Sequence, residues 1–565
     1  MKLPNLLETV TEPTGENAKA LGAYYTDARV ADFLVWWAVR SPQDAVLDPS
    51  FGGGTFLCSA CERLRSLGTH PGALVWGSEI DPHVHARTAA WMAEEFGVRK
   101  RNLICSDFFQ IRRTDLPPIS AIVGNPPFIR YQRFSGNARN KAHACAIMEG
   151  VRLTSLSSSW APFLVHSVGI LSHGGRLAMV LPAEISHAAY ATPVLSHLKK
   201  SFGKVTFLTF RKRLFPNLSE DTLLALAENK GAGPGEFFWR DFADASRLVA
   251  LQNRADYAFA GMRRVNGTAL AEGDERLSEC FVPRKALELY RHLAHLPEVR
   301  RLGDLANVGI GYVTGANDFF HLDPQTARRW RIPIDCLRPA VRRGRALQGL
   351  RFTSMDWRLA AENGDAGYLL YVEAEQGLPG SVLAYLEQGE EQGVPRTYKC
   401  RSRSPWFRVP HVYLPDAFLT YMSGVTPRLV ANAMQAVAPN TLHVIRLRPE
   451  ARLTSDELAA SWQTSLTGLS AEIEGHAMGG GMLKLEPTEA QDVLLVCHVT
   501  VNGKLAQLAE ELDSLVRSGK EGEAHLRAND VILKQGIGLT QKECRLLRSA
   551  ADHLRNRRYT RSATT

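Results

Sequence analysis

The apolar run Ile119–Gly124 stops abruptly at Asn125-Pro126-Pro127-Phe128. Each proline fixes φ and lacks a backbone N–H, so a buried strand cannot continue through the pair. The β-branched run therefore predicts a strand that ends at Asn125. In open α/β sheets, ligands bind at the carboxyl ends of the strands, and the Asn125 side chain is expected at that edge. A turn that merely ends a strand fits the same four residues, so the surrounding sequence has to decide.

The Asn-Pro-Pro-Phe turn also offers groups that can activate a planar amine. Such an amine is a weak nucleophile because its lone pair is delocalised into the ring. Two acceptors, the side-chain oxygen of Asn125 and the backbone carbonyl of Pro126, would bind its two N–H groups and favour a pyramidal nitrogen. Phe128 would supply a face on which the base stacks, worth roughly 1–3 kcal/mol.

Three upstream strands end in residues that suit a nucleoside ligand. Asp48–Gly54 contains three consecutive glycines, which let a ligand approach the backbone closely. Glu79, at the end of the next strand, is placed to bind both hydroxyls of a ribose. Asp107 and Phe108 follow the third strand and offer an acceptor for an adenine amine and a ring beside it. We expect these strands at Ala45–Leu47, Ala73–Trp76 and Asn102–Ser106.

Together these motifs resemble the S-adenosylmethionine-dependent adenine-N6 DNA methyltransferases in their gamma arrangement. The matching segments are Asp-Pro-x-x-Gly-x-Gly-x-Phe-Leu from Asp48, Gly-x-Glu-Ile-Asp-Pro from Gly77, Asp107-Phe108 and Asn-Pro-Pro-Phe from Asn125. Leu21-Gly22-Ala23-Tyr24-Tyr25-Thr26 resembles the segment that precedes the glycine loop, although Asp27 stands where the family usually has proline. The resemblance extends from about residue 20 to 495 and implies an enzyme of bacterial type II restriction–modification systems.

The resemblance implies an α/β fold for residues 1–240: a Rossmann-like, seven-stranded, mostly parallel, doubly wound sheet with an antiparallel last strand. It also implies the roles of the site residues. We expect no metal, because methyl transfer from a sulfonium needs positioning more than Lewis acidity. Phe128 and Phe215 would hold the two faces of an adenine flipped out of the duplex, although Phe215 also fits an ordinary core aromatic. The catalytic residues would be Asn125, Pro126 and Phe128, and S-adenosylmethionine would be bound by Thr26, Asp48, Gly52, Glu79, Asp107 and Phe108.

After residue 240 the alternation of apolar strands with amphipathic stretches ends. We expect a helical connection over residues 241–300, a mixed α+β DNA-recognition domain over 301–498 and a helical extension over 499–565. Val308–Phe320 resembles the start of the family's recognition region, and we interpret Thr314–Asp318 as a structural turn supported by the Asn317 side chain. The helical extension, with Leu505, Leu508 and Leu512 on one face, could pack on the recognition domain or reach DNA through Arg555–Tyr559.

Two basic clusters in the recognition region suit a polyanion. Arg342–Arg345 is the first, and Arg396–Arg403, which is interleaved with an aromatic residue, is the second. Basic side chains of this kind neutralise phosphates, and an arginine that reaches a guanine edge adds specificity. A charge run is also compatible with a solvated surface. We predict that the second cluster contacts DNA through Arg396, Lys399, Arg401 and Arg403.

The composition agrees with a DNA-modifying enzyme. The 565 residues include 67 Lys and Arg against 58 Asp and Glu, a net charge of +9 that suits double-stranded DNA. Nine scattered cysteines indicate reduced thiols in the cytoplasm, and we assign Cys58 and Cys61 to the core. No apolar run reaches the roughly 18 residues of a membrane span. We expect a monomer, nucleoid-associated when bound to DNA, with any cognate restriction endonuclease encoded separately.

Two other classes of protein remain open at this point. An Asn-Pro-Pro-aromatic site also suits the transfer of methyl groups to amines of RNA or protein. A catalytically silent DNA-binding specificity protein would keep the fold without the activity, although the glycine loop, Glu79, Asp107 and Asn125 are all present.

Overall fold

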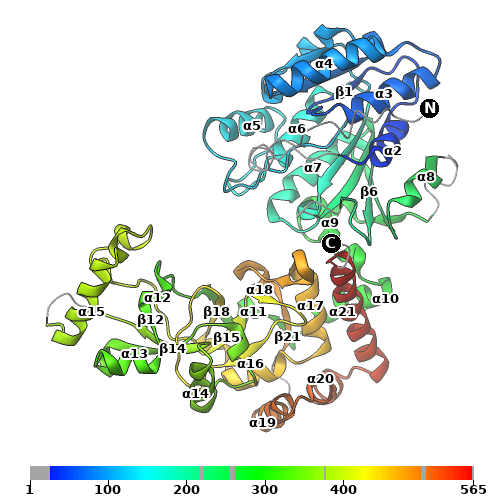
Figure 1. The fold of residues 1–565 in the computed structure, drawn as a ribbon. Helices are drawn as coiled ribbons and strands as arrows, with labels where there is room; N and C mark the ends of the chain where they lie inside the picture. Colours follow the sequence, from blue (N-terminus) through cyan, green and yellow to red (C-terminus); the bar gives the residue numbers. More distant parts are fainter. Residues whose placement is uncertain (1–25, 216–220, 253–260, 374–376, 498–503, 563–565) are drawn as a thin grey trace. The chain divides into compact units, whose positions relative to one another are not determined.

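The computed structural model describes residues 26–215, 221–252, 261–373, 377–497 and 504–562 (Figure 1). The chain divides into two compact units, Met1–Cys280 together with Thr560–Thr565, and Phe281–Tyr559. Within the described ranges, no helix is both long and apolar enough to cross a membrane. Residues 21–25 of the segment that precedes the glycine loop lie outside these ranges, whereas Thr26 lies inside them.

The first unit is built on a nine-stranded sheet with the strand order β3-β2-β1-β4-β5-β7-β6-β8-β9. The strands from β3 to β5 are parallel, and β7 runs antiparallel to both β5 and β6. The antiparallel strand is therefore confirmed. The strands are β1 (Val46–Asp48), β2 (Val75–Glu79), β3 (Leu103–Cys105), β4 (Ala121–Gly124), β5 (Arg176–Pro182), β6 (Phe202–Phe210), β7 (Thr222–Lys230), β8 (Glu236–Phe242) and β9 (Arg263–Val265).

The sheet has two more strands than the seven we predicted. Strand β8 pairs in parallel with β6, and β9 pairs antiparallel with β8. The extension is favourable because Phe237 of β8 is 1% exposed and its ring lies 5.8 Å from that of Phe207. The stretch that we predicted as a helical connection, 241–300, therefore contains part of this sheet, and the boundary between the units falls after Cys280.

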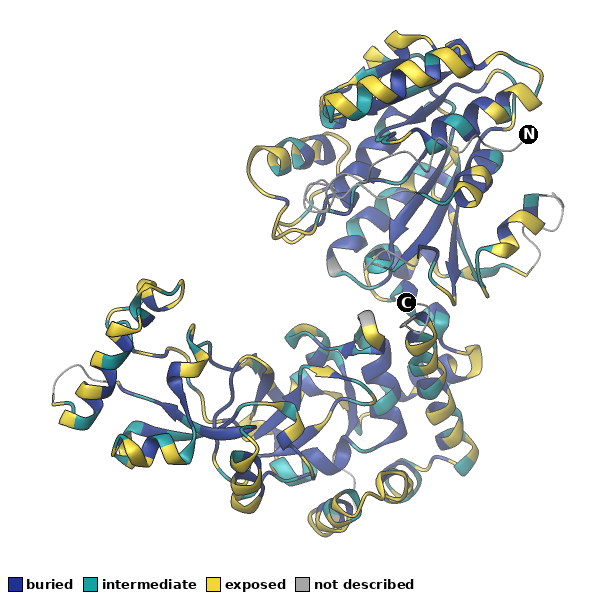
Figure 2. Cartoon of the chain, viewed as in Figure 1, coloured by how far each residue is buried: buried dark blue, intermediate teal, exposed yellow. Residues whose placement is uncertain are grey.

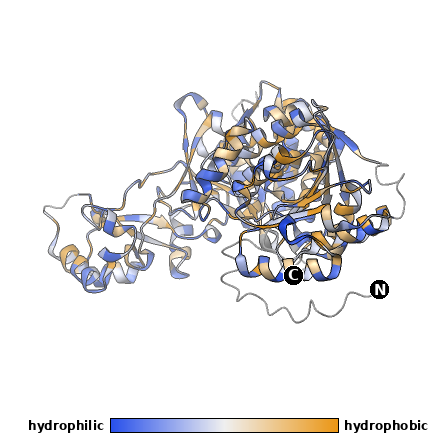
Figure 3. Cartoon of the chain, turned by 90° about the horizontal axis from the view of Figure 1, so that it is seen from above, coloured by the Kyte–Doolittle hydropathy of each residue, from blue (hydrophilic) through white to orange (hydrophobic). Residues whose placement is uncertain are grey.

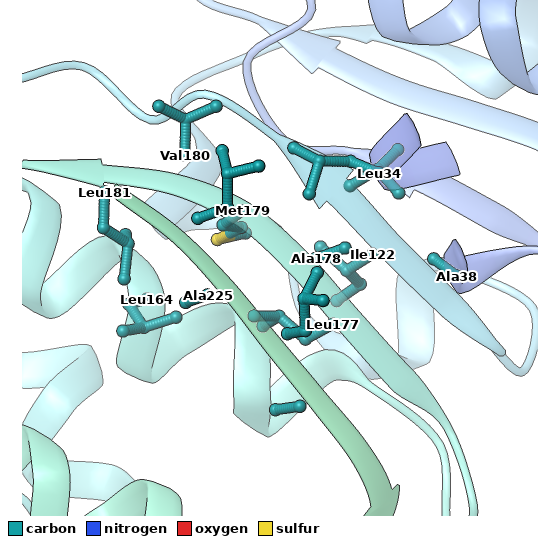
Figure 4. Close-up of a cluster of buried hydrophobic side chains, with 14 of the residues drawn as sticks. Leu34, Ala38, Ile122, Leu164, Leu177, Ala178, Met179, Val180, Leu181 and Ala225 are labelled. Atoms are coloured by element: carbon teal, nitrogen blue, oxygen red, sulfur yellow. The ribbon is translucent and has the colours of Figure 1, made fainter. Parts of the chain in front are cut away.

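Two groups of helices cover this sheet (Figure 1). Helix α2 packs on β4 and β5, and Figure 4 shows its residues Leu34 and Ala38 beside Ile122 of β4 and the apolar strand β5. Helix α6 is buried along almost its whole length, so it lies in the core (Figure 2). The helices are α2 (Ala28–Ala38), α3 (Thr55–Ser66), α4 (Pro82–Phe96), α5 (Gly136–Met148), α6 (Trp160–Ile170), α7 (Thr192–Ser201), α8 (Ser246–Gln252) and α9 (Gly267–Glu272).

The departure from the family pattern at Asp27 has a local explanation. Asp27 caps helix α2, because its side chain accepts the backbone N–H of Arg29 at 2.9 Å. A capping residue thus begins the helix where the family usually has proline.

Cys58 and Cys61 both lie in α3, half-buried and buried, and neither is in a disulfide. Their assignment to the core is confirmed, and burial raises the pKa of the Cys58 thiol to about 12.

The second unit is mixed α+β and contains four small sheets, with the strand orders β10-β21, β11-β18-β15-β17, β12-β14-β13 and β16-β20-β19. The strands are β10 (Val299–Arg301), β11 (Ala306–Ile310), β12 (His321–Leu322), β13 (Leu337–Val341), β14 (Ala366–Leu370), β15 (Ala417–Thr420), β16 (Met422–Ser423), β17 (Leu429–Ala431), β18 (Leu442–Leu447), β19 (His476–Ala477), β20 (Leu483–Lys484) and β21 (Leu494–Val496).

Helices surround these sheets, and hydrophilic and hydrophobic residues both occur along them, as expected for helices with one face on a core (Figure 3). They are α10 (Arg284–Ala294), α11 (Leu302–Leu305), α12 (Asn317–Phe320), α13 (Pro324–Arg329), α14 (Ser354–Glu362), α15 (Gly380–Glu391), α16 (Ser455–Ser461), α17 (Ser465–Glu474), α18 (Pro487–Asp492), α19 (Lys504–Arg517), α20 (Glu521–Ala528), a π-helix (Asn529–Gly536) and α21 (Gln541–Ser562).

The helical extension packs on the rest of the second unit. Leu508 and Leu512 of α19 are buried and Leu505 is partly buried in the same core cluster, which confirms the predicted apolar face. Near the end of α21, Arg558 is 4% exposed and bonded to Glu472 of α17. Arg555 donates to the carbonyl of Val425 at 3.1 Å. Of the two alternatives for this basic end, the structure therefore supports packing for Arg555 and Arg558.

Candidate active site

The strand order of the first sheet reverses between β1 and β4, which are neighbours in it. Ligands bind at such a switch point in doubly wound sheets. The ends of the two strands are packed tightly together, because a Cβ on Gly124 would lie 3.2 Å from Oδ1 of Asp48. A side chain at this position would crowd Asp48 and Pro49, so glycine suits the close approach of the glycine loop to the Asn-Pro-Pro-Phe turn.

The glycine loop is held in an open shape by Glu79 at the end of β2. The N–H of Gly52 donates to Oε2 of Glu79 at 3.0 Å, and the N–H of Asp81 donates to Oε1 at 2.9 Å. Gly52 has a φ of +49°, and a Cβ at this position would meet no described residue within 4 Å. Among the described residues, the loop therefore leaves space beside a carboxylate whose orientation is fixed by two backbone donors.

Asp48 is a buried carboxyl group at the start of this loop. It is 1% exposed, and Oδ1 accepts the N–H of Ser50 at 3.0 Å. Burial raises the pKa of Asp48 to about 8. The hydrogen bond from the N–H of Ser50 opposes this rise, and the nearby charge of Glu79 adds to it. A buried carboxylate of this kind is stabilised by a cation. The α-ammonium group of a methionine moiety would be such a cation.

This raised pKa predicts how stability depends on pH in the ligand-free protein. Between the ordinary value of 3.8 and about 8, the folded chain holds a proton on Asp48 that the unfolded chain has lost. Stability from this group should therefore fall as the pH rises through that window. We expect Asp48→Asn to match wild type near pH 4 and to exceed it in stability at pH 8, measured by urea unfolding. The exposed Asp274→Asn should show no such difference, and equal pH profiles for Asp48→Asn and wild type would contradict the assignment.

Asn125 is the best-defined polar group at the end of β4. Its Nδ2 donates to the hydroxyl of Thr26 at 3.2 Å, which directs Oδ1 away from Thr26. Oδ1 is buried and accepts no hydrogen bond from any residue that the structure describes. An unsatisfied buried acceptor costs about 1–3 kcal/mol, so such groups call for an explanation. A substrate N–H group would satisfy this acceptor.

The two aromatic residues proposed to hold the base lie in the core of the first unit. Phe128 and Phe215 are each 7% exposed and belong to the same large cluster of buried side chains. Residues 216–220, which include the proline after Phe215, lie outside the described ranges. Burial of Phe215 suits the packing alternative as well as stacking, so the stacking role of both rings stays a prediction.

At the end of the third strand, Asp107 and Phe108 were both expected beside the cofactor adenine, but the ring of Phe108 packs in the core. Oδ1 of Asp107 accepts the N–H of Phe109 at 3.1 Å, and Nζ of Lys141 lies 3.8 Å from Oδ2. Phe108 is 4% exposed, and its ring lies 4.7 Å from the rings of both Phe163 and His166. Phe108 is thus committed mainly to core packing, and its contact with a cofactor adenine stays a prediction.

In the second unit, the structure brings the turn at Thr314–Asp318 together with the second basic cluster, Arg396–Arg403. Gly315 has a φ of +83°, and a Cβ there would lie 2.5 Å from Cβ of Lys399. The hydroxyl of Thr314 donates to Oδ1 of Asn317 at 2.5 Å, which confirms the structural interpretation of that turn. Arg403 donates to the carbonyls of Val313 at 2.6 Å and Thr314 at 2.7 Å.

These contacts distinguish the basic residues assigned to DNA that face solvent from the one that holds a turn. Arg403 holds the Thr314 turn with two of its N–H groups, so the structure gives it a role within the fold that the sequence did not reveal. Lys399 and Arg401 are exposed and lie 5.5 and 5.2 Å from the ring of Tyr398, which is 72% exposed. Arg396 is also exposed. In the first cluster, Arg345 is paired with Asp365 at 2.6 Å.

The sequence analysis missed Ser159, which makes close contacts with the Asn-Pro-Pro-Phe turn. Its hydroxyl donates to the carbonyl of Pro127 and accepts the N–H of Ile129 at 2.8 Å. The available signal was a serine just before an apolar helix, which indicates only a helix cap. Across the described residues, no group of three or more His, Cys, Asp or Glu side chains could hold a metal ion.

Comparisons with known proteins match both units. Residues 6–202 match the family model for N-6 DNA Methylase, and residues 274–533 match the model for the C-terminal domain of Type II methyltransferase M.Eco57I. The chain is 18% identical to Type II methyltransferase M.AccI of Acinetobacter calcoaceticus, over 92% of this chain and 94% of the relative. It is 21% identical to Type II methyltransferase M.XamI of Xanthomonas campestris pv. amaranthicola, over 85% of this chain and 86% of the relative.

Solved structures share the fold. The Type IIL restriction-modification enzyme MmeI, in complex with DNA, superposes with a TM-score of 0.58 at 12% identity, over 96% of this chain and 79% of MmeI. The DrdV–DNA complex gives a TM-score of 0.53 at 12% identity, over 90% of this chain and 58% of DrdV. Together these matches show an enzyme, a DNA adenine-N6 methyltransferase that uses S-adenosylmethionine. Within that class, it is a methyltransferase of the type II restriction–modification systems.

Proposed function

We propose that this enzyme flips a single adenine out of a DNA duplex and presents its N6 amine through Asn125 and Pro126. The observation that carries the proposal is the buried Oδ1 of Asn125, which lacks a donor among the described residues and lies at the switch point of the sheet. The orientation of the side chain suits an acceptor, because its amide nitrogen is already bonded to Thr26.

The proposed mechanism needs positioning rather than a general base. Oδ1 of Asn125 and the carbonyl of Pro126 would accept the two N–H groups of the amine and expose its lone pair for in-line attack. The amine would form the new N–C bond as the S–C bond breaks, and it would then release one proton to water. Bringing reactants together in the right geometry accounts for much of the rate of such a reaction.

S-adenosylmethionine supplies the electrophilic methyl group on its sulfonium. The residues present fit this cofactor, because the loop leaves free space beside Gly52 and because Asp48 is a buried carboxyl that suits an ammonium group. Glu79 would bind the ribose hydroxyls. The full proposed set is Thr26, Asp48, Gly52, Glu79, Asp107 and Phe108, in the gamma arrangement of motifs.

Phe128 and Phe215 would stabilise the flipped base. Extruding a base from a duplex costs a few kcal/mol. Stacking on one aromatic ring contributes roughly 1–3 kcal/mol per base, so two faces could offset a cost of that size. The two rings are already ordered in the core, so little conformational entropy would be lost when the base binds.

The second unit would supply DNA recognition, with residues 301–498 as its proposed domain and 499–565 as a packed extension. Arg396, Lys399 and Arg401 are proposed to contact the DNA backbone, whereas Arg403 would act by holding their loop. The basic net charge of +9 supports a polyanionic partner. We further propose a cytoplasmic monomer that acts with a restriction endonuclease encoded separately.

The function can be tested by expressing the protein in cells that lack adenine methylation and sequencing their genomic DNA with single-molecule detection of N6-methyladenine. Methylation confined to one sequence motif would support the proposal and identify the target. Cytosine-N4 methylation would contradict the adenine assignment. No DNA methylation, together with methylated RNA or protein in the same cells, would favour the alternative substrates.

The DNA-contact proposal predicts a change in salt dependence. The plot of log K against log salt has a negative slope, and each neutralised phosphate contributes about 0.9 to its magnitude. Lys399→Gln combined with Arg401→Gln should therefore reduce that magnitude by about 1.8. The matched control is Lys100→Gln with Arg101→Gln, two exposed residues that precede β3 and so lie at the sheet edge opposite the site. Fluorescence anisotropy at several salt concentrations measures both slopes. Equal slopes for the two double variants would contradict the assignment.

A further inference from the structure

We infer that Ser159 is a positioning residue that holds the Asn-Pro-Pro-Phe turn in its base-binding shape. The inference rests on the proposed function, because it assumes that Phe128 contacts the flipped adenine. Ser159 is 2% exposed and immediately precedes α6. It belongs to none of the motifs that identify the cofactor or substrate sites.

The first argument is that the hydroxyl of Ser159 does not cap its own helix. A serine at this position normally accepts a backbone N–H from the first turn of the helix, a bond worth about 1 kcal/mol. Ser159 makes no such bond, and its backbone already has helical angles, with φ of −60° and ψ of −28°. The side chain is instead directed to another segment of the chain.

That segment is the turn carrying Phe128. The hydroxyl of Ser159 donates to the carbonyl of Pro127 and accepts the N–H of Ile129 at 2.8 Å. The backbone N–H of Ser159 also donates to the carbonyl of Ile129 at 3.0 Å. One residue thus holds the backbone on both sides of Phe128, which limits the orientations that the ring can adopt.

The residues on either side of Ser159 are themselves anchored. Nε1 of Trp160 donates to Glu184 at 3.1 Å and to the hydroxyl of Tyr190 at 3.0 Å, and the hydroxyl of Ser158 donates to Glu184 at 3.4 Å. Glu184 follows β5, which is the strand next to β4 in the sheet. The clamp is therefore connected to the sheet beside Asn125 rather than to a surface loop.

Loss of the hydroxyl should loosen the turn without removing any group that touches the substrate. The carbonyl of Pro127 and the N–H of Ile129 would each lose a partner, and leaving buried polar groups unsatisfied is unfavourable. The effect should therefore fall on capture of the base. Cofactor binding should be retained, because Ser159 contacts neither the glycine loop nor Glu79 in the bonds that the structure describes.

The experiment compares Ser159→Ala with the matched control Ser157→Ala. Ser157 is fully buried two residues away, and its hydroxyl has no hydrogen-bond partner among the described residues. With 2-aminopurine at the target position, base flipping is read as a rise in fluorescence. We expect Ser159→Ala to lower the flipped fraction and kcat/KM by about 10- to 100-fold, the equivalent of about 1.4–2.8 kcal/mol. Ser157→Ala should resemble wild type.

Two further measurements separate positioning from loss of structure. Ser159→Cys keeps the side-chain volume with weak hydrogen bonding, so it should show the same defect with an intact thermal transition. Placing the target adenine in a mismatch lowers the cost of extrusion and should partly restore activity of Ser159→Ala. A defect in overall folding would not respond to the mismatch, and that result would overturn the inference.

The inference and the proposed function fail in different ways. If wild type methylates adenine and Ser159→Ala flips and methylates equally well, the inference is overturned and the proposed function stands. If wild type neither flips nor methylates adenine in DNA that carries its genomic motifs, the proposed function fails and the inference falls with it.

Discussion

Asn125→Ala is expected to abolish methyl transfer to DNA while leaving the affinity for S-adenosylmethionine nearly unchanged. The variant removes Oδ1, the buried acceptor that lacks a donor among the described residues, and so removes one of the two groups that we propose orient the amine. Removing one preorganised polar group of this kind typically costs about 100- to 1,000-fold in rate. Single-turnover assays with labelled cofactor measure the rate, and calorimetry measures cofactor binding.

A matched control is available in the same unit. Asn137 is exposed in the first turn of α5, so Asn137→Ala makes the same chemical change away from the switch point. It should methylate at the wild-type rate. Turnover of Asn125→Ala within about threefold of wild type would contradict the role of this side chain, whatever the rate of the control. Loss of cofactor binding in Asn125→Ala would instead mean that the residue supports the glycine loop.

The strands that carry the site could be predicted because each is an apolar run that ends in polar residues or glycine. The expected strand at Ala45–Leu47 corresponds to β1, and the run that ends at Gly124 corresponds to β4. The second strand begins later than expected, at Val75, because Pro71 starts a short 3-10 turn that includes Ala73. Such shifts depend on local turn chemistry and leave the order of the motifs unchanged.

The contacts made by individual side chains were less predictable, because they depend on partners far away in the sequence. Phe108 follows Asp107 in the family motif, yet its ring packs on residues of α6. Arg401 and Arg403 have the same local charge pattern, but Arg401 is exposed beside the ring of Tyr398, whereas Arg403 donates to carbonyls 89 and 90 residues away. A local pattern cannot distinguish a cation that faces solvent from one that holds a turn.

The second large effect is expected for Arg558→Met, which should lower the free energy of unfolding of the second unit by about 3–5 kcal/mol. The side chains of Arg558 and Glu472 are each 3% exposed. Nε and Nη2 of Arg558 donate to the two carboxylate oxygens at 3.1 and 3.0 Å. Arg558 also donates to the carbonyls of Gly424 at 2.6 Å and Val425 at 2.7 Å. The variant would remove both of these bonds to a buried carboxylate, whereas the carbonyls of Gly424 and Val425 would keep donors from Tyr559 and Arg555.

The control variants separate this buried pair from a general effect of the helix. Arg548 is exposed on the same helix α21, and Arg548→Met should change stability by less than about 0.5 kcal/mol. Combining Arg558→Met with Glu472→Leu should cost less than Arg558→Met alone, because the second change removes a buried carboxylate that has lost its main partner. Chemical unfolding followed by circular dichroism measures all three variants. A double variant that is less stable than Arg558→Met would contradict the account.

The pH dependence of Arg558→Met provides an independent check. Burial raises the pKa of Glu472 above its ordinary value of 4.5, and Arg558 opposes that rise. Without Arg558 the pKa should rise further, so the folded variant would hold a proton that the unfolded chain releases. Stability should then fall as the pH rises above about 4.5, and the deficit relative to wild type should be larger at pH 8 than at pH 5. Arg555, whose Nε lies 3.4 Å from Oε1 of Glu472, would limit this effect, so Arg555→Met added to Arg558→Met should enlarge it.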